Sequence, residues 1–544
     1  MNLIVGPLLR YVGEREATIW VETDGPCEVE ILGTHERTFH VEGHHYALVI
    51  VEGLAPGSAT EYEVLVDGKL RWPDPKLDFP PSVIRTLGGN SRKIAFGSCR
   101  VSVPHDAPYN LASDEDERGR EVDALYALAL RMRSEPMERW PHLLILLGDQ
   151  VYADEVSPRT DEFIRARRDT SQPPGEQVAN FEEYTRLYWE SWEEPIFRWL
   201  ASTVSTSMIF DDHDVHDDWN TSRKWVDDMR ATDWWDERVV SGLMAYWIYQ
   251  HIGNLSPREL RESEFYARVK DAEDAGPILR QFAFRADRES GAQHWSFHRD
   301  LDGTRLIVMD SRAGRVLESD KRCMMDDGEW DWIVEHATGD FDHLLLATSL
   351  PALLAPGMQY LEAWSEAVCA GAWGGAAARA GEQVRQLVDL EHWGAFGESF
   401  EKLTRLLEEV GSGKRGRPPA SIVLLSGDVH HAYLAEIAFR REAGVESAVY
   451  QAVCSPVRNP LGKREQLFMR ALASRPTHAL GRALARAAGV DDPSIRWRFA
   501  GDQTFDNQIA TLDIDGRAAE LRIEKTTVGS TELEASLDRR LAGG

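Results

Sequence analysis

The stretch LLILLGDQVYAD, residues 143–154, indicates the architecture of this chain. Its first five residues are apolar and have the length of a buried strand, and a glycine and an aspartate follow directly. Short apolar runs followed by polar residues recur at four other places. The polar segments that follow them are residues 97–100, 211–219, 310–312 and 426–431. Because these short runs alternate with long helical stretches, the sequence predicts a layered α/β or α+β fold.

The side chains at these five strand ends are of types that bind metals or phosphate. In open sheets, ligands bind beyond the carboxyl ends of the strands, so we expect these residues to converge on one site. Each signal alone is weak, since Asp149 fits a turn or a helix cap and Cys99 or His213 fits a buried core. Asp310 and Arg312 alone fit a structural ion pair. Together, however, so many carboxylates would repel one another unless cations held them, and the pattern therefore predicts a metal site.

The residue types also bear on which metals would bind. Carboxylates and imidazoles suit divalent cations, and bridging aspartates suit two ions ~3.5–4 Å apart. A thiolate and a tyrosine phenolate add anionic donors, which favour ferric iron over magnesium. A structural zinc site usually has four Cys or His ligands, and the sequence has no such set.

Composition and charge exclude several classes of protein. The chain has 544 residues, of which 43% are hydrophobic and 28% charged, so neither disorder nor a collagen-like repeat is expected. It has 61 Lys and Arg against 90 Asp and Glu, a net charge of −29, which disfavours binding to duplex nucleic acid. A small phosphorylated substrate remains compatible with this charge where cations neutralise it locally. No apolar run reaches the ~18 residues of a transmembrane segment.

Cysteine usage and the N-terminal residues bear on the compartment. The five cysteines are scattered and odd in number, so no disulfide framework is predicted. The first sixteen residues carry no basic region, no cleavage site and no twin arginine. We therefore expect a cytoplasmic protein, and no feature of the sequence sets its oligomeric state.

Two domains are predicted. Residues 1–88 have alternating short strands with turn signals, typical of a small all-β sandwich, and we interpret this segment as a packing or positioning module. A proline-rich connector at 72–81 and Gly88–Gly89–Asn90 mark the boundary. Residues 89–544 form the second domain, with helical insertions between its strands.

Four further segments carry weaker predictions. The aromatic-rich stretches 182–199 and 225–251 read as amphipathic helices whose aromatic side chains belong to the core. The small-residue run 367–381 predicts a loop or a tightly packed helix, and residues 508–522 predict a hairpin. The basic segment 463–486 is most simply a solvated helical face, with a membrane, a partner or an anionic substrate as alternatives.

The motifs FGSCR, LLGDQVYAD, FDDHDVHDDW, VMDSR and LLSGDVHH together resemble the PhoD-like (alkaline phosphatase D) family of metallophosphoesterases. This resemblance implies a four-layer α/β/β/α sandwich of two mixed sheets, with a small N-terminal all-β domain. It implies hydrolysis of phosphate monoesters or diesters with ferric iron and calcium, with manganese, zinc and magnesium as alternative metals. The first strand end, Gly97–Ser98–Cys99–Arg100, lacks the Asp-x-His motif of ordinary calcineurin-like enzymes, and their Gly-Asn-His and Gly-His-x-His motifs occur at none of the five strand ends.

The resemblance also implies roles for individual residues. Cys99 and Tyr152 would bind the iron, and Asp149 would bridge the two metals. Asp212 occupies the place of the asparagine in the Gly-Asn-His motif and is an implied ligand, and Asp428 and His430 would complete the site. His213 would be the catalytic acid. Glu391 and Trp393 resemble a further family segment, but Ala395–Phe396 departs from its usual Gly-Tyr, so no role is assigned there.

Three functional hypotheses follow from the residues. The first is a metal-dependent phosphoesterase, in which a metal-activated water attacks phosphorus while Arg312 and Arg100 stabilise the spreading negative charge. The second is a non-catalytic protein that binds metal and phosphate ligands in the same fold. The third, an iron oxygenase, is disfavoured because no two-His-one-carboxylate pattern occurs at a plausible spacing.

Overall fold

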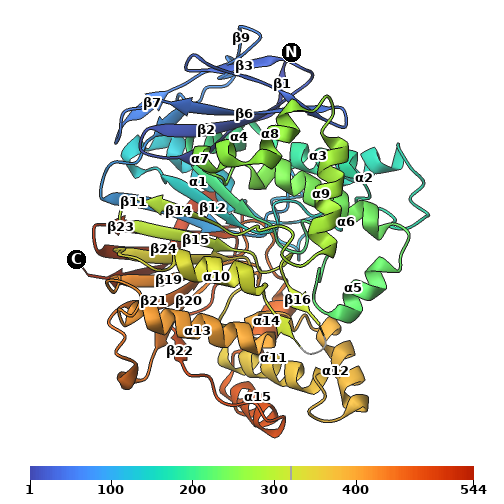
Figure 1. Cartoon of the computed structure of the whole chain (residues 1–544), viewed down its shortest axis with the longest axis vertical. Coiled ribbons are helices and arrows are strands. Elements are labelled where there is room, and N and C mark those ends of the chain that lie inside the picture. Colours follow the sequence, from blue (N-terminus) through green and yellow to red (C-terminus); the bar gives the residue numbers. More distant parts are fainter. Residues whose placement is uncertain (319–320, 544) are drawn as a thin grey trace.

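The computed structural model describes residues 1–318 and 321–543, and its centre is formed by two large sheets (Figure 1). The six-stranded sheet has, in spatial order, β13 (Ser205–Ile209), β12 (Leu143–Leu147), β11 (Ser91–Gly97), β23 (Gln508–Asp515), β24 (Ala518–Thr527) and β25 (Ser530–Ala542). The seven-stranded sheet has β14 (Phe297–Leu301), β15 (Thr304–Met309), β18 (His343–Thr348), β19 (Ser421–Ser426), β21 (Ala448–Val453), β20 (Tyr433–Ala438) and β22 (Arg496–Phe499).

Both sheets are mixed, and within each sheet the strands that precede the predicted site are parallel to one another. β11, β12 and β13 pair in parallel, as do β15, β18, β19 and β21, whereas β23 runs antiparallel to β11. β12, β18 and β19 are buried along their whole length, which explains why they are apolar without alternation. Parallel order brings the carboxyl ends of the strands to one edge of each sheet.

The two sheets pack face to face and are covered by helices on their outer faces. Phe96 and Ile145 of one sheet share an apolar core with Val308, Leu345 and Val423 of the other. α10 (Asp327–His336) and α13 (Gly397–Gly411) cover the seven-stranded sheet. α1 (Ala124–Ser134) and α4 (Pro195–Thr203) cover the six-stranded sheet. The predicted four-layer α/β/β/α fold is thus confirmed.

The N-terminal region contains only strands, as predicted. One sheet has the order β1 (Leu3–Val12), β2 (Glu16–Thr23), β6 (His44–Glu52) and β5 (Phe39–Val41). A second has β4 (Thr34–Arg37), β3 (Glu28–Ile31), β8 (Val64–Val66) and β9 (Lys69–Trp72), and β10 (Val83–Arg85) pairs with β7 (Ala59–Glu61). The predicted boundary at residues 88–89 lies between β10 and β11.

A buried arginine joins this β region to the rest of the molecule. The guanidinium of Arg10, on β1, donates hydrogen bonds to the carbonyls of Tyr249 (2.7 Å) and Gln250 (2.6 Å) and to Asn254 Oδ1 (3.2 Å). Asn254 in turn accepts from the amide of Met208 (3.0 Å) on β13. The β region therefore supports the strand that carries the predicted Asp212–His213 pair, which fits a positioning role.

The aromatic-rich stretches form buried helices, as expected. They comprise α3 (Phe181–Trp192), α4, α5 (Arg223–Arg230), α6 (Trp235–Tyr246) and η2 (Trp247–His251). Trp192, Trp199 and Trp235 are each 1% exposed, so these rings belong to the core. Neighbouring elements on this side are η1 (Met137–Arg139), α2 (Pro158–Arg165), α7 (Pro257–Glu262), α8 (Glu264–Asp271) and α9 (Gly276–Arg288).

The C-terminal half adds a group of helices at the lower end of the view in Figure 1. The small-residue run forms the end of α11 (Pro356–Cys369), a turn and the start of α12 (Gly375–Leu387). The basic segment forms α14 (Lys463–Leu472) and α15 (Arg475–Ala487), and β23 and β24 form the predicted hairpin. The remaining elements are β16 (Val316–Leu317), β17 (Arg322–Cys323), η3 (Trp393–Ala395) and η4 (Arg441–Ala443). Among the described residues, every helix is too short or too polar to cross a bilayer.

Candidate metal centre

The ends of three predicted strands meet where the two central sheets face each other. Beyond β11, the amides of Cys99 and Arg100 donate to the carbonyls of Gly148 (3.3 Å) and Asp149 (3.2 Å), which follow β12. Across the gap between the sheets, the amide of Asp428, after β19, donates to Ser98 Oγ (3.0 Å). The structure thus joins segments that are more than 300 residues apart in sequence.

Backbone geometry explains the Gly-Asp pairs of two motifs. Gly148 has φ of +103°, and a Cβ there would lie 2.5 Å from the Cβ of Asp211, so only glycine fits. A Cβ on Gly427 would collide with Ser98. Asp149 (φ 51°) and Asp428 (φ 65°), which follow these glycines, both adopt the left-handed conformation that aspartate tolerates better than most residues. The chain therefore turns sharply after each strand and directs these aspartates to the sheet edge.

Three buried carboxylates form the centre of the site. Oxygens of Asp149, Asp211 and Asp212 lie within 4.8 Å of one another. In the described part of the chain, one oxygen of each (Oδ1 of Asp149, Oδ2 of Asp211 and Oδ1 of Asp212) is buried without a hydrogen-bond partner. Burial, and then the neighbouring carboxylates, raise the pKa of Asp149 and of Asp211 well above the usual value, although His213 and Arg312 oppose this. Buried carboxylate oxygens without partners are the donors that a bound cation would satisfy.

A thiol and a phenol lie beside this cluster. The Cys99 thiol donates to Asp149 Oδ2 (3.2 Å) and lies 3.4 Å from the carbonyl oxygen of Asp428. The Tyr152 hydroxyl accepts from Asn459 Nδ2 (3.3 Å). Burial raises the pKa of both groups, and for both the Asp149 carboxylate adds to the effect. A cation would reverse this effect, because it stabilises the thiolate and phenolate forms.

Asp428 and His430 complete the set of predicted ligands. Asp428 Oδ2 lies 3.0 Å from Nε2 of His392, whose Nδ1 lies 2.8 Å from Glu362 Oε1. His430 is half-buried, and burial lowers the pKa of its imidazole. A neutral imidazole is the form that binds metals.

The predicted acid, His213, is held by a carboxylate. Its Nδ1 lies 3.0 Å from Asp154 Oδ1, and its Nε2 lies 3.8 Å from Asp217 Oδ1. Burial lowers the pKa of His213, but Asp212, Asp154 and Asp149 outweigh this and raise it well above 6.5. Asp154 stays ionised, since His213 lowers its pKa to about 2 despite burial. The raised pKa favours the protonated imidazole, and Asp154 fixes its orientation.

The two predicted phosphate-binding arginines are both engaged by protein groups. Arg312 is 1% exposed, and its guanidinium contacts Glu391 Oε2 (2.6 Å), Asp211 and Asp212 Oδ1 (3.3 Å). Arg100 donates to Asp123 Oδ2 (2.7 Å) and to the carbonyl of Ser191 (3.0 Å). Arg312 thus lies inside the carboxylate cluster, whereas Arg100 is bonded to the residue that caps α1.

Sequence reasoning missed several residues that shape the site. Asp214 Oδ2 accepts from the amides of Asp149 and Asp211 (2.9 Å each) and so fixes the loops after β12 and β13. The aspartate-rich motif at 211–218 could have indicated this residue. Glu362 and His392 gave no signal, because neither stands at a strand end.

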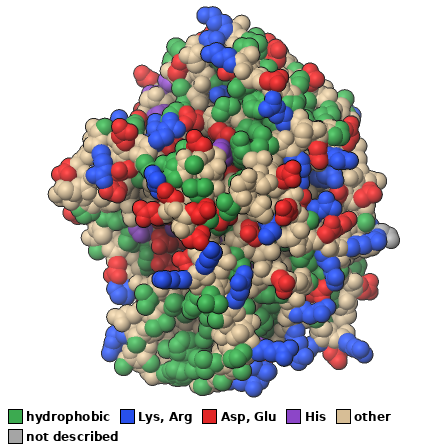
Figure 2. Space-filling view, turned by 180° about the vertical axis from the view of Figure 1, so that it is seen from behind, with side chains coloured by type: hydrophobic (Ala, Val, Ile, Leu, Met, Phe, Trp, Pro, Cys, Tyr) green, Lys and Arg blue, Asp and Glu red, His purple; other side chains and the backbone are tan. Residues whose placement is uncertain are grey.

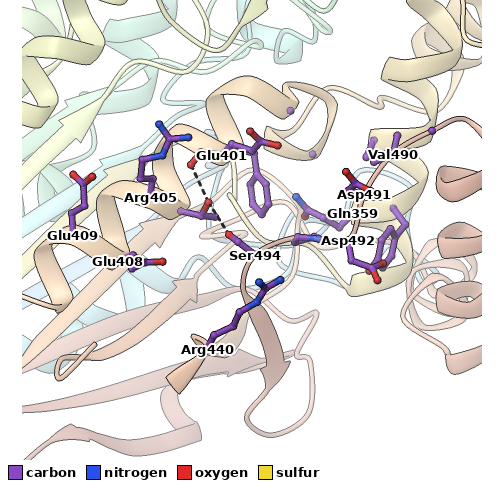
Figure 3. Close-up of a pocket in the computed structure, with 18 of the residues that line it drawn as sticks. Gln359, Glu401, Arg405, Glu408, Glu409, Arg440, Val490, Asp491, Asp492 and Ser494 are labelled. Atoms are coloured by element: carbon purple, nitrogen blue, oxygen red, sulfur yellow. Dashed lines mark hydrogen bonds between the residues drawn. The ribbon is translucent and has the colours of Figure 1, made fainter. Parts of the chain in front are cut away.

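A separate cavity lies away from this centre. It has a volume of about 780 Å³ and lies between α11, α13 and the loop after α15 (Figure 3). Glu401, Arg405, Glu408, Asp491 and Asp492 are among its lining residues. None of the predicted site residues lines it, so the cavity is distinct from the candidate metal centre.

Comparison with known protein families found matches for two segments of this chain. Residues 126–273 match the model of the PhoD-like phosphatases, so this segment is similar to that family. It includes Asp149, Tyr152, Asp212 and His213, and residues 1–84 match a domain of unknown function (DUF7800). No curated protein matches the chain at a significant level.

Two solved phosphatases resemble this chain in fold. A structure described as PhoD is 10% identical over 100% of this chain and 92% of that one, with a TM-score of 0.59. The purple acid phosphatase PPD1 from yellow lupin (Lupinus luteus) seeds is 9% identical over 98% of this chain and 74% of that one, with a TM-score of 0.51. At these identities the likeness concerns the fold alone. The family match supports metal-dependent phosphoester hydrolysis in general terms, as do two groups of side chains that could hold a metal ion, Asp149–Asp211–Asp212 and Asp212–His213–Asp217.

Proposed function

We propose that this chain is a metal-dependent phosphoric ester hydrolase that acts on small phosphorylated substrates, either monoesters or diesters. One observation carries the proposal: three buried carboxylates lie beside a thiol and a phenol where two sheets meet, and Asp149 and Asp211 each have a buried oxygen without a hydrogen-bond partner among the described residues. Such a concentration of buried negative groups is costly unless cations neutralise it. The family match supports phosphate esters as the substrate class.

The donor set fits two different cations. Cys99 and Tyr152, as thiolate and phenolate, would hold ferric iron together with the Asp149 carboxylate, and Asp212, Asp428 and His430 would add oxygen and imidazole donors. The carboxylate oxygens suit calcium, with manganese, zinc and magnesium as alternatives. Cations bound there would withdraw charge from the phosphate and lower the pKa of water.

The chain's own residues supply proton transfer and charge balance. His213, oriented by Asp154, gives a proton to the leaving oxygen of the ester. Arg312 holds Asp211, Asp212 and Glu391 in place, and its Nη2, 3.3 Å from Asp212 Oδ1, faces the cluster. The bonds of Arg100 to Asp123 and Ser191 favour a structural role over the predicted contact with phosphate.

Removal of metal tests this function. Dialysis of the native protein against a chelator should abolish hydrolysis of a chromogenic monoester and a chromogenic diester, and iron with calcium should restore it. Circular dichroism before and after dialysis checks that the fold persists. Undiminished hydrolysis by metal-free protein would contradict the proposal. A metal-loaded protein that binds phosphate but hydrolyses neither ester would support the non-catalytic alternative.

Comparison of substrates with different leaving groups tests whether His213 is the proton donor. A proton donor matters most when the leaving oxygen is strongly basic, so His213→Gln should lower turnover of an alkyl phosphate ~10²–10⁴-fold. Turnover of a p-nitrophenyl ester, whose leaving group needs no proton, should fall much less. His35→Gln, at an exposed position on β4, is the matched control. Equal losses on both esters would show that His213 does not act as the acid.

A further inference from the structure

Exposed apolar side chains are concentrated at one end of the molecule. Among the described residues, twelve large hydrophobic side chains are exposed, and six of them lie on α12, α14 and α15 or in the turn before α12. A seventh, Val388, directly follows α12. The most exposed of these are Leu387 (82%), Leu467 (68%), Leu480 (58%) and Phe468 (55%). Figure 2 shows hydrophobic side chains gathered at the lower end of the molecule, where Figure 1 places these helices.

We call the exposed residues of these three helices, α12, α14 and α15, the apolar–basic surface. Trp373, in the turn before α12, donates to the carbonyl of Ala487 (3.2 Å) at the end of α15. His478 of α15 stacks on Tyr360 of α11, with ring centroids 5.6 Å apart. α14 has no buried residue in the described chain, although it carries a leucine, a phenylalanine and a methionine in succession. Its apolar side chains are therefore available to a partner.

The same helices carry a local excess of positive charge on an acidic protein. Residues 463–486 hold six Lys and Arg against one Glu, whereas the whole chain has a net charge of −29. Some of these cations are paired, since Lys463 contacts Asp114, and Arg482 and Arg486 contact Asp492. Arg464 and Arg475 are exposed and, within the described part of the chain, have no ion-pair partner. The surface thus combines apolar side chains with unneutralised guanidinium groups.

We propose that the apolar–basic surface docks the protein on an anionic lipid bilayer. Helices lying in the membrane plane insert apolar side chains below the headgroups while Lys and Arg contact anionic lipids. Charge complementarity favours this partner, because the unpaired guanidinium groups would be attracted to anionic headgroups. An anionic bilayer would repel the rest of this acidic protein. Duplex nucleic acid fits less well, since it offers no apolar phase for Leu467 and Phe468.

The position of α14 relates this surface to the candidate metal centre. Asn459 contacts the Tyr152 hydroxyl (3.3 Å), and α14 begins only four residues later at Lys463. That length of chain spans at most ~14 Å. A recess with acidic side chains is seen on the same face above the hydrophobic region (Figure 2). Docking would hold the centre close to the lipid headgroups, although docking itself does not depend on the proposed activity.

Vesicle co-sedimentation of the full chain tests the proposal. Equimolar phosphatidylglycerol and phosphatidylcholine vesicles should bind the protein, and pure phosphatidylcholine vesicles should not. The double variant Leu467→Ser/Phe468→Ser should bind at least about tenfold more weakly, because apolar insertion is lost. Arg464→Glu/Arg475→Glu should weaken binding and reduce its salt dependence. Phe284→Ser, at a 45% exposed position on α9, is the matched control and should bind normally.

Three results would overturn the proposal. One is the absence of sedimentation with anionic vesicles, and another is equal binding of the wild type and the Leu467→Ser/Phe468→Ser variant. The third is a wild-type dimer that the same variant converts to a monomer, which would assign the surface to contact between copies of the chain. Thermal unfolding of each variant shows whether the fold is retained, and Arg464→Glu/Arg475→Glu gives an independent result where the apolar variant fails to fold.

Discussion

Replacing Asp149 by alanine is expected to lower both metal content and turnover by orders of magnitude. Asp149 belongs to the buried carboxylate group, and its Oδ2 accepts a hydrogen bond from the Cys99 thiol. Its loss would therefore remove a metal-binding carboxylate that contacts both the other aspartates and the thiol. Elemental analysis and an ester hydrolysis assay on the same preparation would measure both effects. Full activity with full metal occupancy would disprove the assignment.

Two further variants separate loss of metal from loss of fold in the Asp149 experiment. Asp149→Asn keeps an oxygen and tolerates the left-handed backbone at φ 51°, so it should fold normally and still bind metal poorly. Asp502→Ala removes an exposed carboxylate and should change neither quantity. In metal-free protein, Asp149→Asn should not lower the melting temperature, because burial disfavours the charged carboxylate there.

Replacing Arg312 by methionine is expected to destabilise the metal-free protein by about 3–5 kcal/mol, because buried carboxylates lose their counter-charge. The guanidinium contacts Asp211, Asp212 and Glu391, and all three are buried. Urea unfolding would measure this loss. Added iron and calcium should recover part of the stability, since cations supply the missing positive charge.

The same experiment distinguishes two roles for Arg312. If the arginine acted only on phosphate, Arg312→Met would raise KM or lower kcat and leave metal-free stability unchanged, contrary to our account. Arg312→Lys keeps the charge but not the fork of donors, so it should be less destabilising than Arg312→Met. Arg417→Met is a suitable control, because Arg417 contacts Asp342 at an exposed position.

The fold and the positions of several candidate site residues could be predicted because the signals are local. A buried five-residue strand such as residues 143–147 must end at the sheet edge, so Asp149 must lie there. The same reasoning places Cys99 and Asp428, and the structure joins both to Asp149 through direct contacts. The glycines of the motifs follow from steric limits at the turn, as Gly148 illustrates.

Other features depend on packing between distant segments and could not be predicted. His392 contacts both Glu362 and Asp428. These three residues lie on α11, in a loop and at a strand end, and no spacing rule in the sequence relates them. The bond of Arg100 to Asp123 arises because Asp123 caps α1 near β11. The basic segment was expected to be a solvated face, but only the structure reveals that Leu467 and Phe468 are exposed beside its arginines.

Elemental analysis of the native protein tests the central claim most directly, namely that distant strand ends assemble a metal centre. We predict that iron and a second metal, calcium in the simplest case, copurify with the chain in near-stoichiometric amounts. Their removal should abolish ester hydrolysis. A native preparation that contains no bound metal and still hydrolyses phosphate esters would contradict the account.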